Sequence, residues 1–472
     1  MCTDAAPTSD GQAGTGAPPD GTAAPGGAAS VPSAGGTPAE VSPASDPAPA
    51  ARRVDDGAVT TTPAPRPRRL APPFAGATPR PGTDVPVAPA APPAPSGAWR
   101  PGDAVGNRRF CDVGTLELES GLDLPDVTVA YETWGTLAPD GSNAVLVLHA
   151  LTGDAHVTGD AGPGHPTPGW WSQMIGPGAP IDTDRYFVVA PNVVGGCQGS
   201  TGPASPAPDG RPWGSRFPHL TVRDQVAAEI ALAHALGITR WHFVVGGSMG
   251  GLRALEWAIC GPEGGVEVEA IGVIASGAQT TGDQIAWAHP QIAAILADPH
   301  FHGGDYYDAP DGVGPHVGLG IARQVAHATY RSATELDRRF GRIPQHAEDP
   351  LRGGRYAIQS YLDHHAHKLA SRFDANSYLV LTQSMLTHDL GRDRGGVESA
   401  LASITAKALV VAVDSDRLFQ PVESERITRN VPGAWPLQVL RSEHGHDGFL
   451  IEFDQLGPVV RHFLKRLVTR RG

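Results

Sequence analysis

The amino-acid sequence of this 472-residue chain predicts an α/β protein with a mostly parallel sheet. From residue 113 onward, short runs rich in β-branched residues alternate with amphipathic segments of helical period, which is typical of βαβ units. Most of these runs are apolar throughout, as expected for parallel strands that helices cover on both faces. The two observations together predict one large α/β domain.

Eight segments have the length and composition of strands. The first two are separated by a short turn and alternate apolar and polar residues, as an antiparallel hairpin at a sheet edge would. The later ones are continuously apolar and are expected to form the parallel part of the sheet. The eight segments are residues 113–119, 127–134, 144–149, 185–190, 241–245, 270–275, 408–413 and 436–441.

The sixth and seventh of these segments are separated by a long stretch rich in Arg, His and Tyr. Helical periodicity is present in residues 317–330, 333–340 and 354–372. A structureless loop of this length is implausible in a compact domain, so we expect an inserted helical subdomain over about residues 281–395. Such an insertion would lie as a lid over the carboxyl ends of the strands, where active sites form.

The first part of the chain has a different composition, because Pro, Ala, Gly, Ser and Thr dominate residues 1–98. These residues bury too little apolar area to offset the entropy lost on ordering. We therefore expect a disordered arm over residues 1–98 and a catalytic domain over residues 99–472.

Charge and composition exclude several classes of protein. The net charge of −13 and the absence of a basic cluster argue against a nucleic-acid binder. No apolar stretch is long enough for a membrane helix and no signal peptide is visible, so we expect a cytoplasmic protein without a membrane partner. The 4 cysteines have neither disulfide-framework nor metal-type spacing, so no metal site is expected.

The most specific motif is Gly-Gly-Ser-Met-Gly-Gly at residues 246–251, between an apolar strand and a helical run. A serine between glycines at a strand-to-helix turn is typical of a nucleophile elbow. A Gly-x-Ser-x-Gly pattern alone is often only a glycine-rich turn, but the strand and helix around it favour Ser248 as a nucleophile.

A serine hydroxyl needs a general base, and the base needs a carboxylate that orients it. In a fold of this kind the chain order is serine, acid, histidine. Asp414 and Asp416 follow the seventh predicted strand, and His444 and His446 follow the eighth. Spacing leaves both pairs of alternatives open, and any one of these residues alone could be a solvated loop residue.

The oxyanion that forms during acyl transfer needs two backbone donors. One is expected to be the amide of Met249, directly after the serine, and the other to lie within residues 150–152 after the third strand. An ordinary β-turn is the alternative interpretation of the latter segment.

Five separated blocks of the sequence occur in a distinctive order. They are residues 143–154 (NAVLVLHALTGD), 192–203 (NVVGGCQGSTGP), 246–257 (GGSMGGLRALEW), 372–378 (RFDANSY) and 445–450 (GHDGFL). Together these blocks resemble the homoserine O-acetyltransferase family of the α/β-hydrolase superfamily. The resemblance covers roughly residues 105 to 467 and leaves the arm uncovered. It implies an α/β-hydrolase fold with an eight-stranded, mostly parallel sheet and an inserted helical lid.

The resemblance assigns a role to each catalytic position. It implies that Ser248 is the nucleophile, that His446 is the base and that Asp416 orients it. It also implies that the amides of Leu151 and Met249 hold the oxyanion.

Three further positions concern the substrates. The resemblance implies that Arg323 holds the carboxylate of an amino-acid substrate and that Asp447 takes its ammonium group. Arg331 is the nearest competing guanidinium, and we expect it to form a salt bridge within the lid. Succinyl-using relatives have an arginine two positions after the triad aspartate, whereas this chain has Leu418, which favours acetyl-CoA.

The implied activity is transfer of an acetyl group from acetyl-CoA to L-homoserine through an acyl-serine, a step toward methionine. Acetyl-CoA is then a cosubstrate, no metal or redox cofactor is implied, and the family's dimers predict a homodimer through the inserted helices. Relatives that acylate serine, relatives that use succinyl-CoA, and an esterase are the alternatives. A non-catalytic scaffold is a further one, although it would be expected to lack a triad residue, and all three are present.

Overall fold

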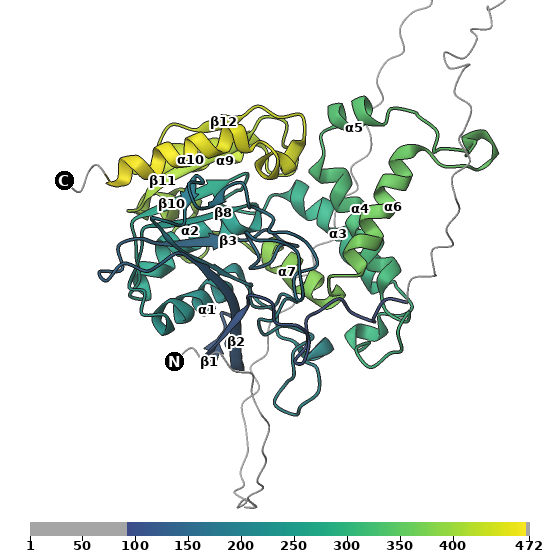
Figure 1. Ribbon diagram of the computed structural model, residues 1–472, viewed down its shortest axis with the longest axis horizontal. Coiled ribbons are helices and arrows are strands. Elements are labelled where there is room, and N and C mark those ends of the chain that lie inside the picture. The colour runs from purple at the N-terminus through teal and green to yellow at the C-terminus, as the bar shows by residue number, and fades with distance from the viewer. Residues whose placement is uncertain (1–91, 469–472) are drawn as a thin grey trace, which may run out of the picture. The chain divides into compact units, whose positions relative to one another are not determined.

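The computed structural model describes residues 92–468 and confirms the predicted fold. The main sheet has 8 strands in the order β1-β2-β6-β3-β8-β10-β11-β12 (Figure 1). The pairs β1–β2 and β2–β6 are antiparallel, and the other pairs are parallel. The strands are β1 Arg109–Glu117, β2 Asp123–Trp134, β3 Ala144–Leu148, β6 Phe187–Pro191, β8 Phe243–Gly247, β10 Ala270–Ile274, β11 Lys407–Val413 and β12 Gln438–Leu440.

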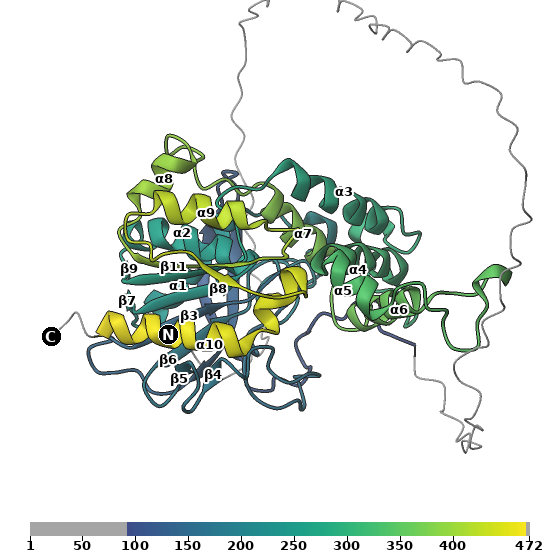
Figure 2. The same cartoon turned by 90° about the horizontal axis from the view of Figure 1, so that it is seen from above.

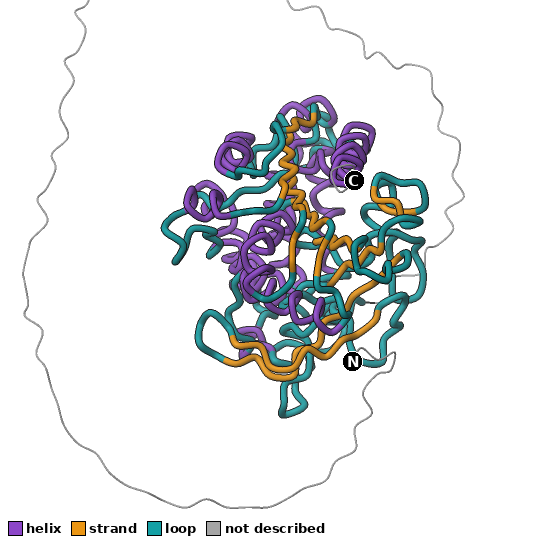
Figure 3. Tube along the Cα trace, turned by 90° about the vertical axis from the view of Figure 1, so that its left-hand side faces the viewer, coloured by secondary structure: helices purple, strands orange, loops and turns teal. Residues whose placement is uncertain are grey.

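Every residue of β3, β8 and β10 is buried, because helices pack on both faces of the sheet (Figure 3). Alternate side chains of β8 serve the two cores: Val244 packs toward one face, while Phe243 and Val245 pack toward the other. The first core contains α1 Val222–Ala235, α2 Met249–Glu263, α8 Val397–Ser403 and α9 Pro421–Asn430. The second core is covered by α10 Phe453–Val468.

The predicted strand over residues 241–245 is displaced in the structure. Arg240–Trp241 form a separate short strand, β7, which pairs with β9 Glu267–Val268, and the central strand β8 starts only at Phe243. A further short pair is formed by β4 Ile175–Gly176 and β5 Ile181–Asp182. The central strand β8 ends at Gly247, directly before the serine of the motif.

The insertion is helical, and Figure 2 shows its helices gathered at one end of the sheet. The predicted segments correspond to α4 His316–Tyr330, α5 Ala333–Arg339 and α6 Ala357–Ala370, while α3 Gly282–Leu296 and α7 Ala375–Leu386 were not among the predicted helices. Helix α4 packs between α3 and α6. Short 3-10 helices complete the described elements: η1 Gly214–Arg216, η2 His302–Gly304, η3 Pro350–Arg352 and η4 Gly445–Leu450.

The predicted arm falls largely outside the described residues, but its last part, residues 92–98, is described and packed. The Ser96 hydroxyl donates to Asp374 Oδ1 at 2.7 Å, and the Gly97 amide donates to the Phe373 carbonyl at 3.2 Å. Residues just before position 99 thus already pack against the segment that precedes α7. Among the helices of residues 92–468, none has the length and apolarity needed to cross a membrane.

Candidate active site

Ser248 lies between the end of β8 and the start of α2, in a conformation that non-glycine residues rarely adopt. Its φ is 56° and its ψ is −125°, and it is 6 % exposed. The Ser248 amide donates to the Ile274 carbonyl at 2.9 Å, and the Ser276 hydroxyl donates to the Ser248 carbonyl at 2.9 Å. These bonds hold the strained turn from the neighbouring strand β10.

The glycines of the motif are required by close approach. A Cβ on Gly246 would lie 2.4 Å from the backbone of Gly250, and a Cβ on Gly250 would lie 2.1 Å from the Leu148 carbonyl oxygen. A Cβ on Gly247 would lie 2.4 Å from the ring of Phe449. Real Cβ atoms do not tolerate these distances, so the turn exists only with small residues on both sides of the serine.

The structure brings His446 and Asp416 together. His446 Nδ1 lies 2.7 Å from Asp416 Oδ2, and both side chains are buried. The other carboxylate oxygen, Asp416 Oδ1, accepts hydrogen bonds from the amides of Leu418 at 2.8 Å and Phe419 at 2.9 Å. The carboxylate is thereby fixed against Nδ1, which leaves Nε2 of His446 for proton transfer.

The competing residues have other partners. Asp414 Oδ1 accepts from the Ser442 amide at 2.9 Å, and His444 Nδ1 lies 3.4 Å from Glu335 Oε1. Sequence spacing left Asp414 and His444 open, and the side-chain pairing separates them from Asp416 and His446.

Burial lowers the pKa of His446, but the charge and hydrogen bond of Asp416, followed by the charges of Asp447 and Glu423, outweigh burial and raise it. The ring of Phe419 stacks on the His446 ring with 5.4 Å between centroids. The imidazole is therefore held in place by one charge partner and one aromatic face.

The side chain of His149 fixes the turn that follows β3. The Gly153 amide and His149 Nδ1 both donate to the Ala150 carbonyl, at 2.9 and 2.8 Å. His149 Nε2 accepts from the Val193 amide at 3.1 Å, so the ring proton must be on Nδ1. Because a peptide is planar, fixing the Ala150 carbonyl also fixes the Leu151 N–H, which points the opposite way.

The amides of Leu151 and Met249, the two predicted oxyanion donors, hydrogen-bond to no other group within residues 92–468. Met249 is fully buried, and a buried N–H without a partner is rare in folded proteins. Two such donors at this end of the sheet have the chemistry needed to stabilise an oxyanion.

Sequence reasoning missed His149 and the arginine that supports it. Arg253 Nη2 donates to the His149 carbonyl at 2.6 Å, and its Nη1 pairs with buried Glu229. Burial, and then the charge of Arg253, lower the pKa of His149 to about 3, so the ring is neutral at pH 7. The signal available in the sequence was Arg253 itself, a charged residue in the mostly apolar helical run that begins there.

A pocket of about 260 Å³ lies between the lid helices and the segment that follows His446. Arg323, Arg331, Lys368 and Arg372 line it together with Asp447, which follows His446 in the sequence. Ser248 is not among the lining residues. The structure thus places both predicted amino-acid-binding residues, Arg323 and Asp447, in one pocket.

The two candidate arginines have different environments. Arg331 Nε lies 3.1 Å from Asp447 Oδ2 and its Nη1 lies 3.0 Å from Glu335 Oε1, so it forms the expected salt bridge. Arg323, in contrast, has no carboxylate within ion-pair distance in the described part of the chain. Its guanidinium lies over the ring of Tyr330, 5.6 Å from the centroid. Of the two candidate arginines, Arg323 is therefore the one without a carboxylate partner.

Leu418 lies two positions after Asp416 and packs beside Phe419 in a small cluster that also contains Leu252. Its neighbour Arg417 is directed to the lid, where Nη2 donates to the Ala328 carbonyl at 2.6 Å and the guanidinium lies over Trp287. Arg417 therefore has protein partners of its own.

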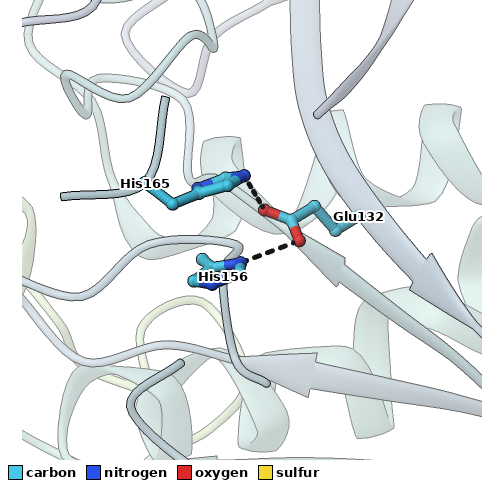
Figure 4. A group of neighbouring side chains, drawn as sticks. All are labelled: Glu132, His156 and His165. Carbon is cyan, nitrogen blue, oxygen red and sulfur yellow. Dashed lines mark hydrogen bonds and ion pairs between the residues drawn. The ribbon is translucent and has the colours of Figure 1, made fainter. Parts of the chain in front are cut away.

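Among the described residues, one buried group of metal-ligand residue types lies elsewhere, between β2 and the long loop that follows β3 (Figure 4). Glu132 Oε2 lies 3.1 Å from His156 Nδ1 and Glu132 Oε1 lies 3.4 Å from His165 Nε2. The two rings stack at 3.9 Å with only 9° between their planes, so their in-plane lone pairs do not converge on one point. His165 Nε2 also accepts from the Asn107 amide at 2.9 Å. These contacts are better explained as structural contacts that hold the loop after β3 to β2 than as a metal centre.

Comparison with known proteins agrees with this geometry. The α/β hydrolase fold family matches residues 143–453. The homoserine O-acetyltransferase of Thermobifida fusca is 59 % identical over 375 residues, which cover 79 % of this chain and 98 % of the relative.

Two solved structures extend the comparison. The homoserine O-acetyltransferase from Bacillus anthracis is 25 % identical with a TM-score of 0.69, covering 76 % of this chain and 97 % of that one. Esterase E22 is 28 % identical with a TM-score of 0.69, covering 76 % of this chain and 99 % of that one. The chain therefore belongs to the homoserine O-acetyltransferase family of α/β-hydrolase-fold proteins.

Proposed function

We propose that this chain is a homoserine O-acetyltransferase that transfers an acetyl group from acetyl-CoA to the side-chain hydroxyl of L-homoserine. The observation that supports this proposal is the pocket next to the His446 loop. It contains Asp447 and Arg323, an arginine without a carboxylate partner. A free amino acid presents one carboxylate and one ammonium group. Arg323 offers a guanidinium for the first, and Asp447, which also pairs with Arg331, offers a carboxylate for the second. An esterase has no need of such a pair.

In the first half-reaction the Ser248 Oγ attacks the thioester carbonyl while His446 Nε2 takes the hydroxyl proton. The Leu151 and Met249 amides donate to the oxyanion, and Asp416 stabilises the imidazolium. The intermediate then expels the CoA sulfur, which takes the proton from His446 and leaves as the thiol. An acetyl-serine remains.

In the second half-reaction L-homoserine binds with its carboxylate on Arg323 and its ammonium group near Asp447. His446 takes the proton of the side-chain hydroxyl, whose oxygen attacks the acetyl-serine carbonyl. Collapse of this intermediate returns the proton to Ser248 and releases O-acetyl-L-homoserine, an intermediate toward methionine. Neither half-reaction requires a metal or a redox cofactor.

Leu418 is proposed to select acetyl-CoA over succinyl-CoA. An apolar side chain gives a succinyl carboxylate no hydrogen bond, and removing that carboxylate from water without a partner costs several kcal/mol. The bonds of Arg417 to the lid support this proposal, because they keep the neighbouring cation occupied. We expect discrimination of about 100-fold or more.

A homodimer through the lid is also proposed. Leu296 of α3 and Val317 and Ile321 of α4 are 56 %, 67 % and 44 % exposed, and α3 packs against α4. Apolar side chains gathered on two neighbouring helices are typical of an interface.

As a biosynthetic enzyme of amino acids, the protein is expected in the cytoplasm.

A matrix assay tests the activity. Acetyl-CoA and succinyl-CoA are each combined with L-homoserine, L-serine or water, and thiol release is followed with the parent protein and with Leu418→Arg. We expect acetyl transfer to homoserine to dominate and the variant to gain succinyl transfer. Equal thiol release with and without an amino acid would indicate an esterase, and comparable use of both donors by the parent would refute the acetyl assignment.

A further inference from the structure

Thr152 connects the oxyanion turn with the lid pocket. It follows Leu151 directly, and its carbonyl accepts a hydrogen bond from Arg372 Nη1 at 3.0 Å. Its hydroxyl accepts from Arg323 Nη1 at 3.4 Å. Both arginines line the pocket proposed for the amino acid. One residue therefore contacts the turn on one side and the ligand-binding cations on the other.

The two bonds differ in strength. At 3.0 Å the Arg372 bond has ordinary length, whereas the Arg323 bond at 3.4 Å is long and weak. The rest of the turn is held independently of the lid by His149, Gly153 and Arg253. The hydroxyl bond of Thr152 is thus the adjustable connection between the turn and the pocket.

The cations of the pocket are incompletely balanced. Burial, and then the neighbouring charge of Arg323, lower the pKa of Arg372. A ligand carboxylate on Arg323 would supply the missing anion and hold the long side chain in one position. A guanidinium has five N–H donors, so a bidentate carboxylate leaves others for the Thr152 hydroxyl. Fixing Arg323 therefore strengthens its bond to Thr152.

We propose that Thr152 is a positioning residue that couples the acceptor pocket to the oxyanion turn. An acceptor whose carboxylate sits on Arg323 tightens Thr152 and so adds a second restraint, on the C-terminal side of Leu151, to the one that His149 provides through the Ala150 carbonyl. The Leu151 amide is then held from both sides, and the acetyl-serine reacts faster when the pocket holds an amino acid. This inference rests on the proposed function and extends it. It gives the enzyme a means to favour transfer over hydrolysis, because water brings no carboxylate to Arg323.

The test uses the acetylated enzyme and two probes that cannot accept the acetyl group through a hydroxyl. L-2-aminobutyrate is homoserine without its hydroxyl, and it leaves that position open to a water molecule. Propylamine lacks the carboxylate as well. We expect saturating L-2-aminobutyrate to accelerate hydrolysis of the acetyl-enzyme about tenfold, the equivalent of one ordinary hydrogen bond, and propylamine to have no effect.

Two variants locate the effect. Thr152→Val removes the hydroxyl but keeps the shape, and it should abolish the acceleration, so that its acetyl-enzyme is hydrolysed at the same rate with and without L-2-aminobutyrate. Thr152→Ser keeps the hydroxyl and should retain the acceleration. A ratio of the two rates in Thr152→Val that equals the ratio in the parent would reduce Thr152 to a structural residue and overturn the proposal.

The parent protein decides the question even where a variant does not fold. Unchanged or slower hydrolysis with L-2-aminobutyrate would overturn the coupling. Failure of the proposed function would look different, because acetyl-CoA would then form no acetyl-enzyme, or L-homoserine would not discharge the acetyl-enzyme to O-acetyl-L-homoserine.

Discussion

The two turns that follow β3 and β8 lie beside the lid pocket but are built in a different way. In the turns, the main chain determines the geometry. Glycines permit close contact in the turn after β8, and neutral His149 fixes a peptide plane in the turn after β3. In the pocket, long charged side chains from α4, α6 and the His446 loop meet, and ion pairs such as Arg331–Asp447 hold them. Backbone geometry tolerates little change, whereas charged side chains can be exchanged one at a time.

This contrast predicts different kinds of functional loss. Changes at the turn should affect the chemical step, because its groups stabilise the transition state. Changes in the pocket should affect recognition of the acceptor or stability of the lid. The same contrast is consistent with the fold's occurrence in both esterase E22 and acetyltransferases.

The largest effect is expected from the triad carboxylate. Asp416→Asn should lower kcat by about 10³ to 10⁴, because the amide can no longer hold the correct tautomer of His446 or stabilise its imidazolium. Asp414→Asn is the matched control, since Asp414 bonds to the Ser442 amide, and it should change kcat by less than about tenfold. Steady-state kinetics with both variants test this; similar losses would break the distinction between the two aspartates.

A smaller and different effect is expected in the pocket. Arg323→Ala should raise the KM for homoserine by about 10- to 100-fold while leaving the KM for acetyl-CoA nearly unchanged, because only the acceptor carries the carboxylate.

Arg331→Ala serves as the control for this prediction. It leaves Asp447, whose side chain is only 16 % exposed, without its ion-pair partner and should mainly lower stability, measured by urea unfolding. Equal rises of both KM values in Arg323→Ala would instead indicate a structural role for Arg323.

Acid should destabilise both regions. Burial, followed by positive charges nearby, lowers the pKa of His149 to about 3 and that of His327 in the lid to about 2. The unfolded chain then binds more protons below pH 6.5, so stability is lost as pH falls through that value, by up to about 1.4 kcal/mol per pH unit for each histidine. Urea unfolding of the parent and of His327→Gln between pH 7.5 and 5 measures the slope. An unchanged slope in the variant would separate His327 from this effect.

The smallest effect concerns the N-terminal boundary. A chain starting at residue 92 should match the full chain in stability and activity. A chain starting at residue 99 loses the bonds of Ser96 and Gly97 to the segment before α7 and should be less stable by about 1–2 kcal/mol. Thermal unfolding of both chains tests this, and equal midpoints would show that residues 92–98 contribute nothing.

Much of the fold was predictable because hydrophobic period reports burial directly. The predictions were incomplete where that signal is weak. Helix α7 is buried on nearly all sides, so its sequence has no exposed polar face that alternates with an apolar one. Helix α3 contains Pro290, which is unusual inside a helix. Ser96 gave no signal, since its partner Asp374 lies far away in the sequence.

At the candidate site, motifs predicted the serine and the two loops that follow the seventh and eighth strands. They did not separate Asp414 from Asp416, because the choice depends on which carboxylate faces His446 in three dimensions. The support from His149 and the bonds to Thr152 join residues distant in sequence, so no local pattern contains them.

The central claim is that Ser248 carries the acetyl group between two substrates, and intact-protein mass spectrometry tests it most directly. The protein is mixed with acetyl-CoA alone, quenched, and examined for one added acetyl group, which peptide mapping then locates; a parallel sample is chased with L-homoserine. We predict one acetyl group on Ser248, its loss during the chase with formation of O-acetyl-L-homoserine, and no adduct in Ser248→Ala. Product formation by the parent without any adduct, or an adduct that homoserine does not discharge, would contradict the account.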